Sequence, residues 1–321
     1  MLQYLIRRTL WACVLFLAIT IVAYVIFFVI PVNPAKLACG QRASEACIKN
    51  AQTTLGLDKP VYEQYGRFLW KLVVHQDLGK SYTNRQSVNQ TVMNAAPVTA
   101  SLVLGGAVLW MLIALPVGIL SALRPRSLLD RASMVFVLIG ISATPVWIGL
   151  ILSYIVGFRL GWTPITGYCD FFNPSTDCGG PGQWAWHMIL PWITFSILFA
   201  ALYVRIIRAN VMEASTEDYV RTARAKGAPE SVVIRSHILR NALLPVVTLL
   251  GMDIGVALGG AIFTETVFSL PGMGQTALNA IANFDLPTVQ GIVVFATISI
   301  IVINLVVDLL YVVIDPRIRL N

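Results

Sequence analysis

The sequence predicts a polytopic α-helical membrane protein. Of its 321 residues, 57% are hydrophobic and 12% are charged, whereas a soluble chain usually carries about 25% charged residues. Mean hydropathy is +0.74, and several uncharged runs reach the roughly 18 to 25 residues that a helix needs to cross a bilayer. A barrel of the outer-membrane type would instead show alternating segments of about ten residues. A water-soluble globular fold is therefore excluded.

Six uncharged or nearly uncharged runs are long enough to span the membrane. The first has an apolar centre at 15–30, which is followed by Pro31 and Pro34, residues that end a helix. A removable signal peptide is the weaker interpretation, because the run is long and lacks a small-residue cleavage site. The other expected spans are 98–123, 132–158, 186–204, 242–264 and 288–311. Six spans place both termini on the same side of the membrane.

The spans divide the chain into three regions. These are the N-terminus with the first span (1–30), a polar external segment (31–97), and spans two to six (98–321), which include a cytoplasmic loop at 205–241. The external segment is too polar to enter lipid. Within it, residues 62–73 show helical spacing, with Tyr65, Leu69 and Leu72 on one side. We therefore expect a small helical layer over the outer ends of the spans.

The distribution of Lys and Arg predicts the orientation. The termini and the connections at 124–131 and 205–241 hold 14 Lys and Arg, whereas the short loops at 159–185 and 265–287 hold only Arg159. Positive charge is retained on the cytoplasmic side of a membrane. Both termini are therefore expected in the cytoplasm. The net charge of +7 is mostly a determinant of topology, and no nucleic-acid partner is implied.

Four of the five cysteines fall in the expected external segments. Cys39 and Cys47 lie in the first of these segments and Cys169 and Cys178 in the second, while Cys13 lies in the first span. Cysteine pairs outside a membrane favour disulfides over free thiols, and over a metal site, which would prefer C-x-x-C spacing and histidine partners. Four cysteines allow three pairings, of which proximity favours Cys39 with Cys47 and Cys169 with Cys178.

No catalytic, cofactor or metal site is recognisable. The GKS motif at 79–81 resembles the end of a phosphate-binding loop, but Val74 stands where that loop requires glycine. The three histidines, His75, His187 and His237, lie on different segments, so a histidine metal cluster is not expected. The sequence therefore favours a protein that does no covalent chemistry itself.

Four acidic residues lie within or beside the spans, where acids are costly and often functional. Glu265, Asp285 and Asp308 stand near span ends, where a helix cap or a side chain that reaches the interface is the alternative explanation. Asp253 is deeper, in the glycine-rich segment 251–255. Because these acids are scattered and the spans lack Lys and Arg, an ion-driven carrier with a charged relay is disfavoured.

The cytoplasmic loop between spans four and five is the most informative segment. Ser215 is expected to cap a helix over 216–226, which has acids at its start and bases at its end, and Gly227 and Pro229 then end it. A helix this short is unstable alone in water, so we expect it to dock on another molecule. A solvated helix, or one on the membrane surface, is the alternative.

Motifs along nearly the whole chain resemble one transporter family. The cytoplasmic loop carries DYVRTARAKG at 218–227 and LRNALLP at 239–245, and ETVFSLPGMG follows span five at 265–274. Further matches are NLVVDLLY at 304–311, DPRIR at 315–319, LGLDKP at 55–60, QY at 64–65 and DLGKS at 77–81. In this order they resemble the B-type inner-membrane permease subunits of ABC importers of the peptide/nickel class.

The resemblance implies one of two membrane subunits of an ATP-driven oligopeptide or dipeptide importer in the bacterial cytoplasmic membrane. The implied partners are a second similar permease, two cytoplasmic nucleotide-binding subunits and an external peptide-binding protein that contacts the external segment. ATP would be hydrolysed in the partners, and peptide would pass between the two permeases. Nickel or another small solute is an alternative substrate. A secondary carrier or a channel is a weaker alternative, because neither a clear internal repeat nor a filter sequence is evident.

The loop at 218–227 resembles the EAA loop through which such permeases contact their ATPases. In the general pattern a Glu stands six positions before the glycine, but this position is Arg221 here, so no role of that Glu is carried over. On a helix, Tyr219, Thr222 and Ala223 would share a small face for close approach to a partner. The ATPase-coupling residues implied by the resemblance are Glu213, Asp218, Tyr219, Arg221, Thr222, Ala223, Ala225, Lys226 and Gly227.

Overall fold

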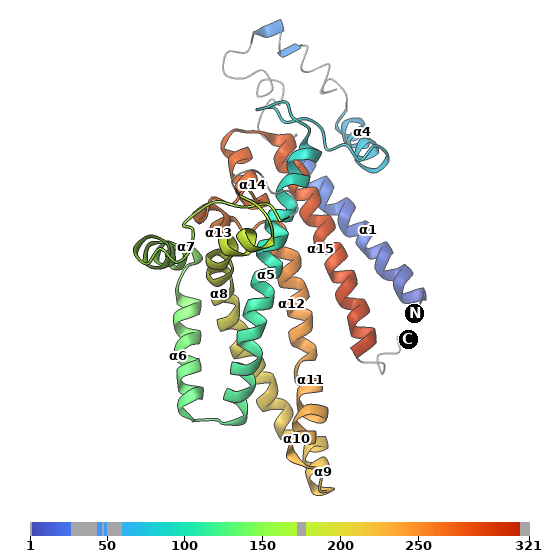
Figure 1. Cartoon of the computed structure of the whole chain (residues 1–321). Coiled ribbons are helices and arrows are strands. Elements are labelled where there is room, and N and C mark those ends of the chain that lie inside the picture. Colours follow the sequence, from blue (N-terminus) through green and yellow to red (C-terminus); the bar gives the residue numbers. More distant parts are fainter. Residues whose placement is uncertain (1, 27–43, 47, 50–59, 172–177, 315–321) are drawn as a thin grey trace.

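The structure, a computed structural model, describes residues 2–26, 44–46, 48–49, 60–171 and 178–314. The regular structure of this described part is nearly all helical, and it contains only isolated β-bridges and no strand. Its principal helices are α1 (Leu2–Tyr24), α4 (Val61–Val74), α5 (Val88–Leu123), α6 (Leu128–Ser142), α7 (Pro145–Leu152), η2 (Ser153–Arg159), α8 (Pro181–Thr216), α9 (Asp218–Ala225), α10 (Glu230–Val232), η3 (Val233–Leu239), α11 (Arg240–Ala242), α12 (Leu244–Ala257), α13 (Ile262–Val267), α14 (Met273–Ala282) and α15 (Leu286–Ile314). Figure 1 shows the long helices side by side.

Four helices of the described part, α1, α5, α8 and α15, are each long and apolar enough to cross a membrane. Two bent pairs meet the same criterion when each is counted as one span, which gives up to six spans. One pair joins α6 to α7 and η2 with a bend of 103°, and the other joins the 230–242 segment to α12 with a bend of 42°. Length and composition are thus compatible with the expected six crossings.

The expected span at 132–158 is not one straight helix, because the chain bends between α6 and α7. Ala143 and Thr144 are extended, with ψ of 131° and 145°. A residue that precedes proline is sterically disfavoured in the helical conformation, and Pro145 follows Thr144. The Thr144 side chain then accepts a hydrogen bond from the Trp147 backbone N–H and caps α7. A new helix therefore begins in a different direction.

The expected fifth span, 242–264, is also interrupted. Helix α12 ends at Ala257 and α13 begins at Ile262. Between them Gly260 has φ +136°, a conformation that L side chains rarely adopt. The remaining spans extend beyond their expected limits: α5 begins at Val88 rather than at residue 98, and α8 continues to Thr216 rather than ending at 204.

The core of the fold is the contact between α5 and α8. Three glycines let the two helices and α6 approach closely, because a Cβ at Gly106, Gly118 or Gly140 would lie 2.6 Å from Phe195, 2.9 Å from Ile207 or 2.6 Å from Ala201, respectively. Between the glycines, the fully buried Trp110 stacks on Phe199 with ring centroids 4.6 Å apart. Small residues with interlocking large ones are the usual packing of membrane helices.

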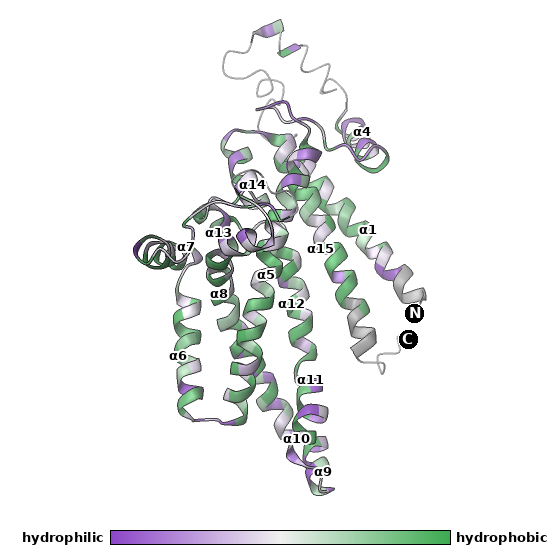
Figure 2. Cartoon of the chain, in the orientation of Figure 1, coloured by the Kyte–Doolittle hydropathy of each residue, from purple (hydrophilic) through white to green (hydrophobic). Residues whose placement is uncertain are grey.

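The helical surfaces are apolar along most of the bundle, and polar residues gather at its ends. Figure 2 shows green helices through the middle and purple residues near α9 and α10 at one end and near the loops by α4 and α14 at the other. Helix α8 has 36 residues, which is about 54 Å of helix, whereas the hydrocarbon core of a bilayer is about 30 Å thick. Helix α8 is therefore longer than the hydrocarbon core, and in Figure 1 its end that carries α9 extends beyond the end of α6.

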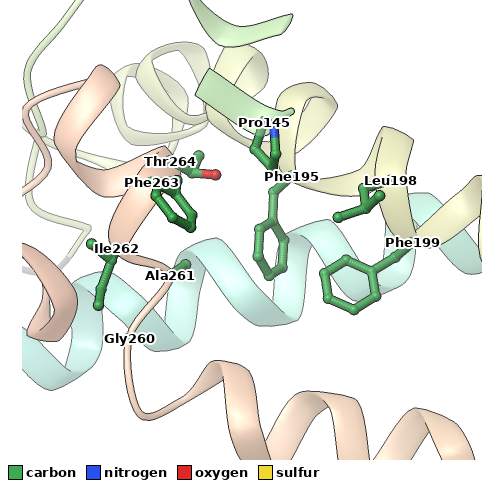
Figure 3. Close-up of a pocket in the computed structure, with 9 residues that line it drawn as sticks. All are labelled: Pro145, Phe195, Leu198, Phe199, Gly260, Ala261, Ile262, Phe263 and Thr264. Atoms are coloured by element: carbon green, nitrogen blue, oxygen red, sulfur yellow. The ribbon is translucent and has the colours of Figure 1, made fainter. Parts of the chain in front are cut away.

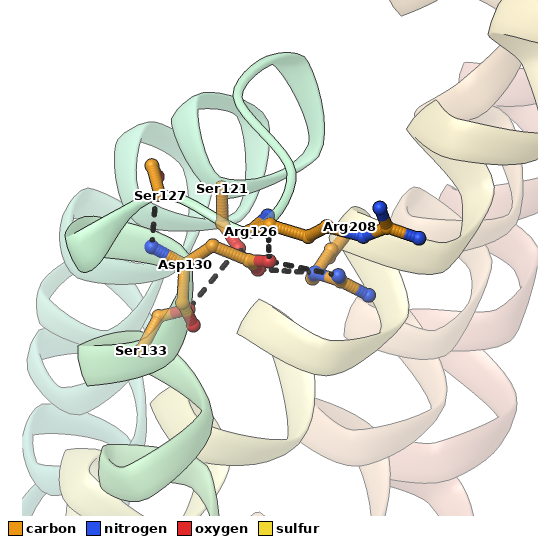
Figure 4. A network of polar contacts seen from close by, with 6 residues as sticks. All are labelled: Ser121, Arg126, Ser127, Asp130, Ser133 and Arg208. Carbon is orange, nitrogen blue, oxygen red and sulfur yellow. Dashed lines mark hydrogen bonds and ion pairs between the residues drawn. The ribbon is translucent and has the colours of Figure 1, made fainter.

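A buried ion pair ties the α5–α6 turn to α8 (Figure 4). The Asp130 carboxylate accepts hydrogen bonds from Arg208 Nε at 2.7 Å and from Arg208 Nη2 at 3.1 Å. It also accepts one from the Ser121 hydroxyl and one from the Arg126 backbone N–H at 2.9 Å. From the sequence, Arg208 and Arg126 were expected only to be topology charges, and Asp130 was not singled out. Their structural role is to hold three helices together.

A second cluster of buried polar residues, centred on Glu265, lies toward the other end of α5. We call it the Glu265 node. Glu265 was expected at a span end, as a helix cap or reaching the interface, but its side chain is fully buried. The carboxylate accepts hydrogen bonds from Thr99 Oγ1 at 2.7 Å and from the Gln275 backbone N–H at 2.9 Å. Thr99 Oγ1 in turn accepts one from the Met273 backbone N–H at 2.8 Å. Glu265 therefore joins α13 to α5 and to the start of α14.

The other three membrane acids have different surroundings. Asp285 directly precedes α15, where it accepts hydrogen bonds from Thr288 Oγ1 at 2.7 Å, from the Tyr82 backbone N–H at 2.8 Å and from the Ser81 hydroxyl. Asp285 thus holds the start of α15 against residues 81–82, and none of these hydrogen bonds comes from a backbone N–H of α15. Asp253 accepts a hydrogen bond from the Tyr203 hydroxyl at 2.7 Å. Asp308 lies in α15.

We expect Asp130→Asn to lower stability strongly, because Arg208 would remain largely buried without its partner. Removing one side of a buried ion pair costs about 3–5 kcal/mol. The double variant D130N/R208M removes both charges and should regain most of the loss. Melting temperatures of the purified variants in detergent measure these changes in stability. Arg205→Met is the matched control, because Arg205 is an exposed arginine on the same helix, α8. A D130N variant as stable as the parent would show that the network does not hold the helices.

We expect Gly272→Ala to destabilise the Glu265 node, because the added Cβ would overlap the Glu265 carboxylate. Overpacking of a tight site typically costs about 1–3 kcal/mol. Gly182→Ala, near the start of α8, is the control, since a Cβ there meets nothing within 4 Å. Faster amide hydrogen exchange in α14 of G272A, but not of G182A, is the predicted result. Equal exchange in the two variants would contradict this role of Gly272.

Candidate functional site

The expected cytoplasmic helix is present as α9, at the projecting end of α8. It spans Asp218–Ala225, slightly shorter than the expected 216–226. Two of its side chains, Val220 and Ala223, are buried, and the helix packs against α8 and η3. Burial of these two residues explains how an eight-residue helix is held in place, since so short a helix is unstable in isolation.

The expected cap at the start of this helix is wrong. Ser215 is still part of α8, and its hydroxyl donates a hydrogen bond to the Val211 carbonyl at 2.6 Å. Serine inside a helix commonly bonds the preceding turn in this way. The residue before α9 is Glu217, which is extended and whose side chain makes no capping hydrogen bond. Asp218 does lie in the first turn, where an acid is favourable.

The end of α9 agrees with the sequence-based expectation. Gly227 has φ +76°, in the left-handed region that favours glycine. Around it, the Gly227 N–H donates to the Arg224 carbonyl at 2.9 Å and the Ala228 N–H donates to the Ala223 carbonyl at 3.2 Å. The turn at Gly227 thus satisfies the last carbonyls of α9 and directs the chain into α10.

An ion pair closes this turn from outside. The Arg224 guanidinium donates to both carboxylate oxygens of Glu230, at 2.7 and 3.2 Å. Both side chains are about half exposed, and exposed pairs contribute little to stability. The hydrogen bonds with Arg224 lower the pKa of Glu230. The pair therefore stays charged at neutral pH and bridges α9 to α10 across the turn at Gly227.

The outward face of α9 differs from the one expected. Ala223 points into the chain's own core rather than toward a partner, because it is one helical turn from the buried Val220 on the same side. Its expected place on a docking face is therefore wrong. The exposed residues among those expected to contact the ATPase are Glu213, Asp218, Tyr219, Arg221, Thr222, Ala225, Lys226 and Gly227.

A groove of about 310 Å³ lies beside α9, where the end of α8 meets α11 and the start of α12. Glu213 and Tyr219, two of the expected coupling residues, both line it. Three of its polar lining residues, Asn210, Glu217 and Asn241, were not predicted as site residues. Asn241 lies inside the recognised motif at 239–245, and this motif was the sequence signal that could have indicated it. The groove is completed by Ala214, Ala242 and Pro245. The site is thus an acidic groove next to an exposed helix with a basic end.

A second pocket, of about 240 Å³, lies where the two broken spans meet α8 (Figure 3). Its walls are almost entirely apolar, with the rings of Phe195, Phe199 and Phe263 among them. Pro145, the first residue of α7, and Gly260, in the break after α12, lie at the two interruptions. Neither was singled out from the sequence, because the pocket is formed only when the two bends come together.

The expected disulfide between Cys169 and Cys178 is present. Cys39 and Cys47 lie outside the described residues, so their pairing stays a prediction. His187 Nδ1 lies 3.2 Å from Cys169 Sγ, and these three residues form a cluster with metal-ligand atoms within 4.8 Å of one another. Metals bind thiolates, and here both sulfurs are bonded to each other. The arrangement therefore favours a structural cross-link.

Comparisons with known proteins place the chain in one family. Residues 114–320 match the model described as binding-protein-dependent transport system inner membrane component, and residues 1–103 match the model of the N-terminal part of such components. A solved amino acid ABC transporter superposes with a TM-score of 0.52 at 13% identity, over 69% of this chain and 93% of that one. This likeness shows the fold alone.

Full-length relatives agree with the family models. The dipeptide transport system permease protein DppB of Escherichia coli K12 is 37% identical over 99% of both chains, and the DppB of Alkalihalophilus pseudofirmus is 37% identical over 99% of this chain and 100% of its own. A putative peptide transport system permease protein of Brucella abortus is 33% identical over 98% of each chain. The chain belongs to the family of inner-membrane components of binding-protein-dependent transport systems, as a multi-pass permease of the bacterial cytoplasmic membrane.

Proposed function

We propose that this chain is one of two permease subunits of an ATP-driven importer of dipeptides or oligopeptides. The substrate class is supported by the relatives, which are named for dipeptide or peptide transport along their full length. Nickel is disfavoured as the substrate by the same relatives. A self-contained carrier is disfavoured by the family, whose members depend on a binding protein.

The proposed topology has six spans and cytoplasmic termini. Each bent pair then counts as one crossing, with α7 and η2 turned across the bundle after α6. The concentration of Lys and Arg at the α9 end supports this orientation. So does the disulfide, because the loop that holds Cys169 and Cys178 would face the oxidising exterior. Residues 31–97, which include α4, would then be external.

The proposed partners are a second similar permease, two cytoplasmic nucleotide-binding subunits and an external peptide-binding protein. Peptide would pass between the two permeases. The observation that carries this proposal is the position of α9: it is exposed on its outer face, anchored by buried Val220 on its inner face, and attached to the end of α8. A docked ATPase subunit would therefore push on a helix that runs through the membrane.

The roles of the coupling residues follow from this arrangement. Tyr219 and Glu213 line the groove beside α9 and would contact the ATPase subunit there. Arg221, Thr222 and Lys226 would contact it from the exposed face of α9. Ala223 and Gly227 would act indirectly, Ala223 by anchoring α9 and Gly227 by setting the direction of the chain after it. Closure of the ATPase pair on ATP would then rock α8 as a rigid body.

Reconstitution tests the proposed function directly. The chain, its expected second permease and both ATPase subunits are placed in liposomes with ATP inside, and the binding protein is added outside with a labelled dipeptide. Dipeptide uptake should need ATP, the binding protein and this chain. Nickel uptake in place of peptide uptake, or peptide uptake without ATP, would contradict the proposal.

Gly227→Val is expected to reduce both ATPase association and peptide uptake while membrane insertion is unchanged. A β-branched residue in the left-handed conformation costs about 1–2 kcal/mol, and relief of this strain would redirect the chain that follows α9. No atom lies within 4 Å of the added Cβ, so the effect is conformational rather than steric. Gly227→Asn is the control, because asparagine tolerates this conformation. A pull-down in which G227V retains the ATPase subunits as well as G227N does would refute the role of this turn.

A further inference from the structure

Helix α4 has three distinct faces, and only one of them is covered by the described chain. The first face packs on α1: the Tyr65 and Thr20 hydroxyls are 3.0 Å apart, the Tyr24 hydroxyl donates to Gln64 at 3.2 Å, and Phe68 lies beside the Tyr24 ring. This contact confirms the expectation that Tyr65 lies on a packed side. It fixes α4 at the end of the first span.

The second face of α4 is apolar and exposed. Tyr62, Trp70 and Val73 point away from α1, and their side chains are 78%, 63% and 63% exposed. At 100° per residue they lie within one sector of the helix. An exposed aromatic and aliphatic face of this kind on one short helix is typical of a surface that contacts lipid or another protein.

The third face of α4 is charged. Glu63, Arg67 and Lys71 follow one another at four-residue intervals, and Arg67 pairs with Glu63 at 2.8 Å. Figure 2 shows the mixed colouring of this helix. A helix with an apolar sector bearing Trp and Tyr, and Lys and Arg on its polar side, has the pattern of helices that lie in the interface of a bilayer.

The position of α4 matches that pattern. Figure 1 shows α4 almost end-on, beside the end of α1 that is remote from α9. Helices α1, α5 and α15 are seen from the side in the same view. Helix α4 therefore lies across the spans, parallel to a membrane surface. Helix α1 continues the same apolar surface, since its exposed side chains include Leu10, Val14 and Val22. The first span and the helix beside its end thus both expose apolar side chains.

We propose that α4 is an interfacial anchor whose Tyr62–Trp70–Val73 face is buried among phospholipid acyl chains beside the first span, with Arg67 and Lys71 at the phosphate level. Long basic side chains readily place their charge at headgroups while their stems remain apolar. The assignment of α4 to the outer leaflet rests on the proposed topology and function, whereas the proposed contact of α4 with lipid is independent of them. The anchor would keep the external segment close to the membrane.

Spin labels at two positions of α4 test this proposal. Val73→Cys on the apolar face and Arg67→Cys on the charged face are compared in the full-length protein in phospholipid nanodiscs, in a Cys13→Ser background. The labelled background without either new cysteine is the blank. Oxygen, which partitions into lipid, and a water-soluble nickel complex report the surroundings of each label. Trp70→Cys provides a second position on the apolar face.

The expected result is a higher ratio of oxygen to nickel accessibility at Val73 and Trp70 than at Arg67. A Val73 label as accessible to nickel as the Arg67 label would show a solvated helix and overturn the proposal. A Val73 label shielded from both reagents would show coverage by protein, such as residues 27–59 or another subunit, and would also overturn it. Because the readout does not involve transport, its failure is distinct from failure of the proposed function.

Discussion

Close packing of α5 against α8 is the interaction on which the rest of the structure depends. In a bilayer, helices gain little from the hydrophobic effect when they associate, so shape complementarity must hold them together. Gly106 and Gly118 on α5 supply it by accepting Phe195 and Ile207 of α8, and Trp110 fills the space between them. Helix α8 is thereby held against α5, and α9 follows at its end.

Two clusters of buried polar residues tie α5 to neighbouring elements, one toward each end of the helix. The Asp130–Arg208 pair joins the α5–α6 turn to α8 near the α9 end. Glu265 and Thr99 join α13 to α5 near the other end. Buried polar groups are costly unless they are paired, so each node favours one arrangement of its helices. Under the proposed function, a push on α9 would therefore move these helices together.

Local signals explain what could be predicted from the sequence. Gly227, Pro229 and the ordered charges locate α9 because a helix end depends on neighbouring residues. The Thr144–Pro145 pair is a local signal for the bend between α6 and α7, but the expected span at 132–158 rested on its lack of charge alone. The burial of Glu265 could not be predicted, because its partner Thr99 is 166 residues away in the chain. The inward direction of Ala223 likewise depends on packing between distant elements.

The most direct test of the account is the distance between spin labels on Arg221, exposed on α9, and Leu112, exposed on α5. Pulsed electron paramagnetic resonance would measure it in the assembled transporter, without nucleotide and with ATP bound but not hydrolysed. Rigid-body coupling predicts the same distance within the chain in both states, while the distance between Arg221 and the second permease changes. A changed distance within the chain would contradict the account, because α9 would then move independently of α5 and α8.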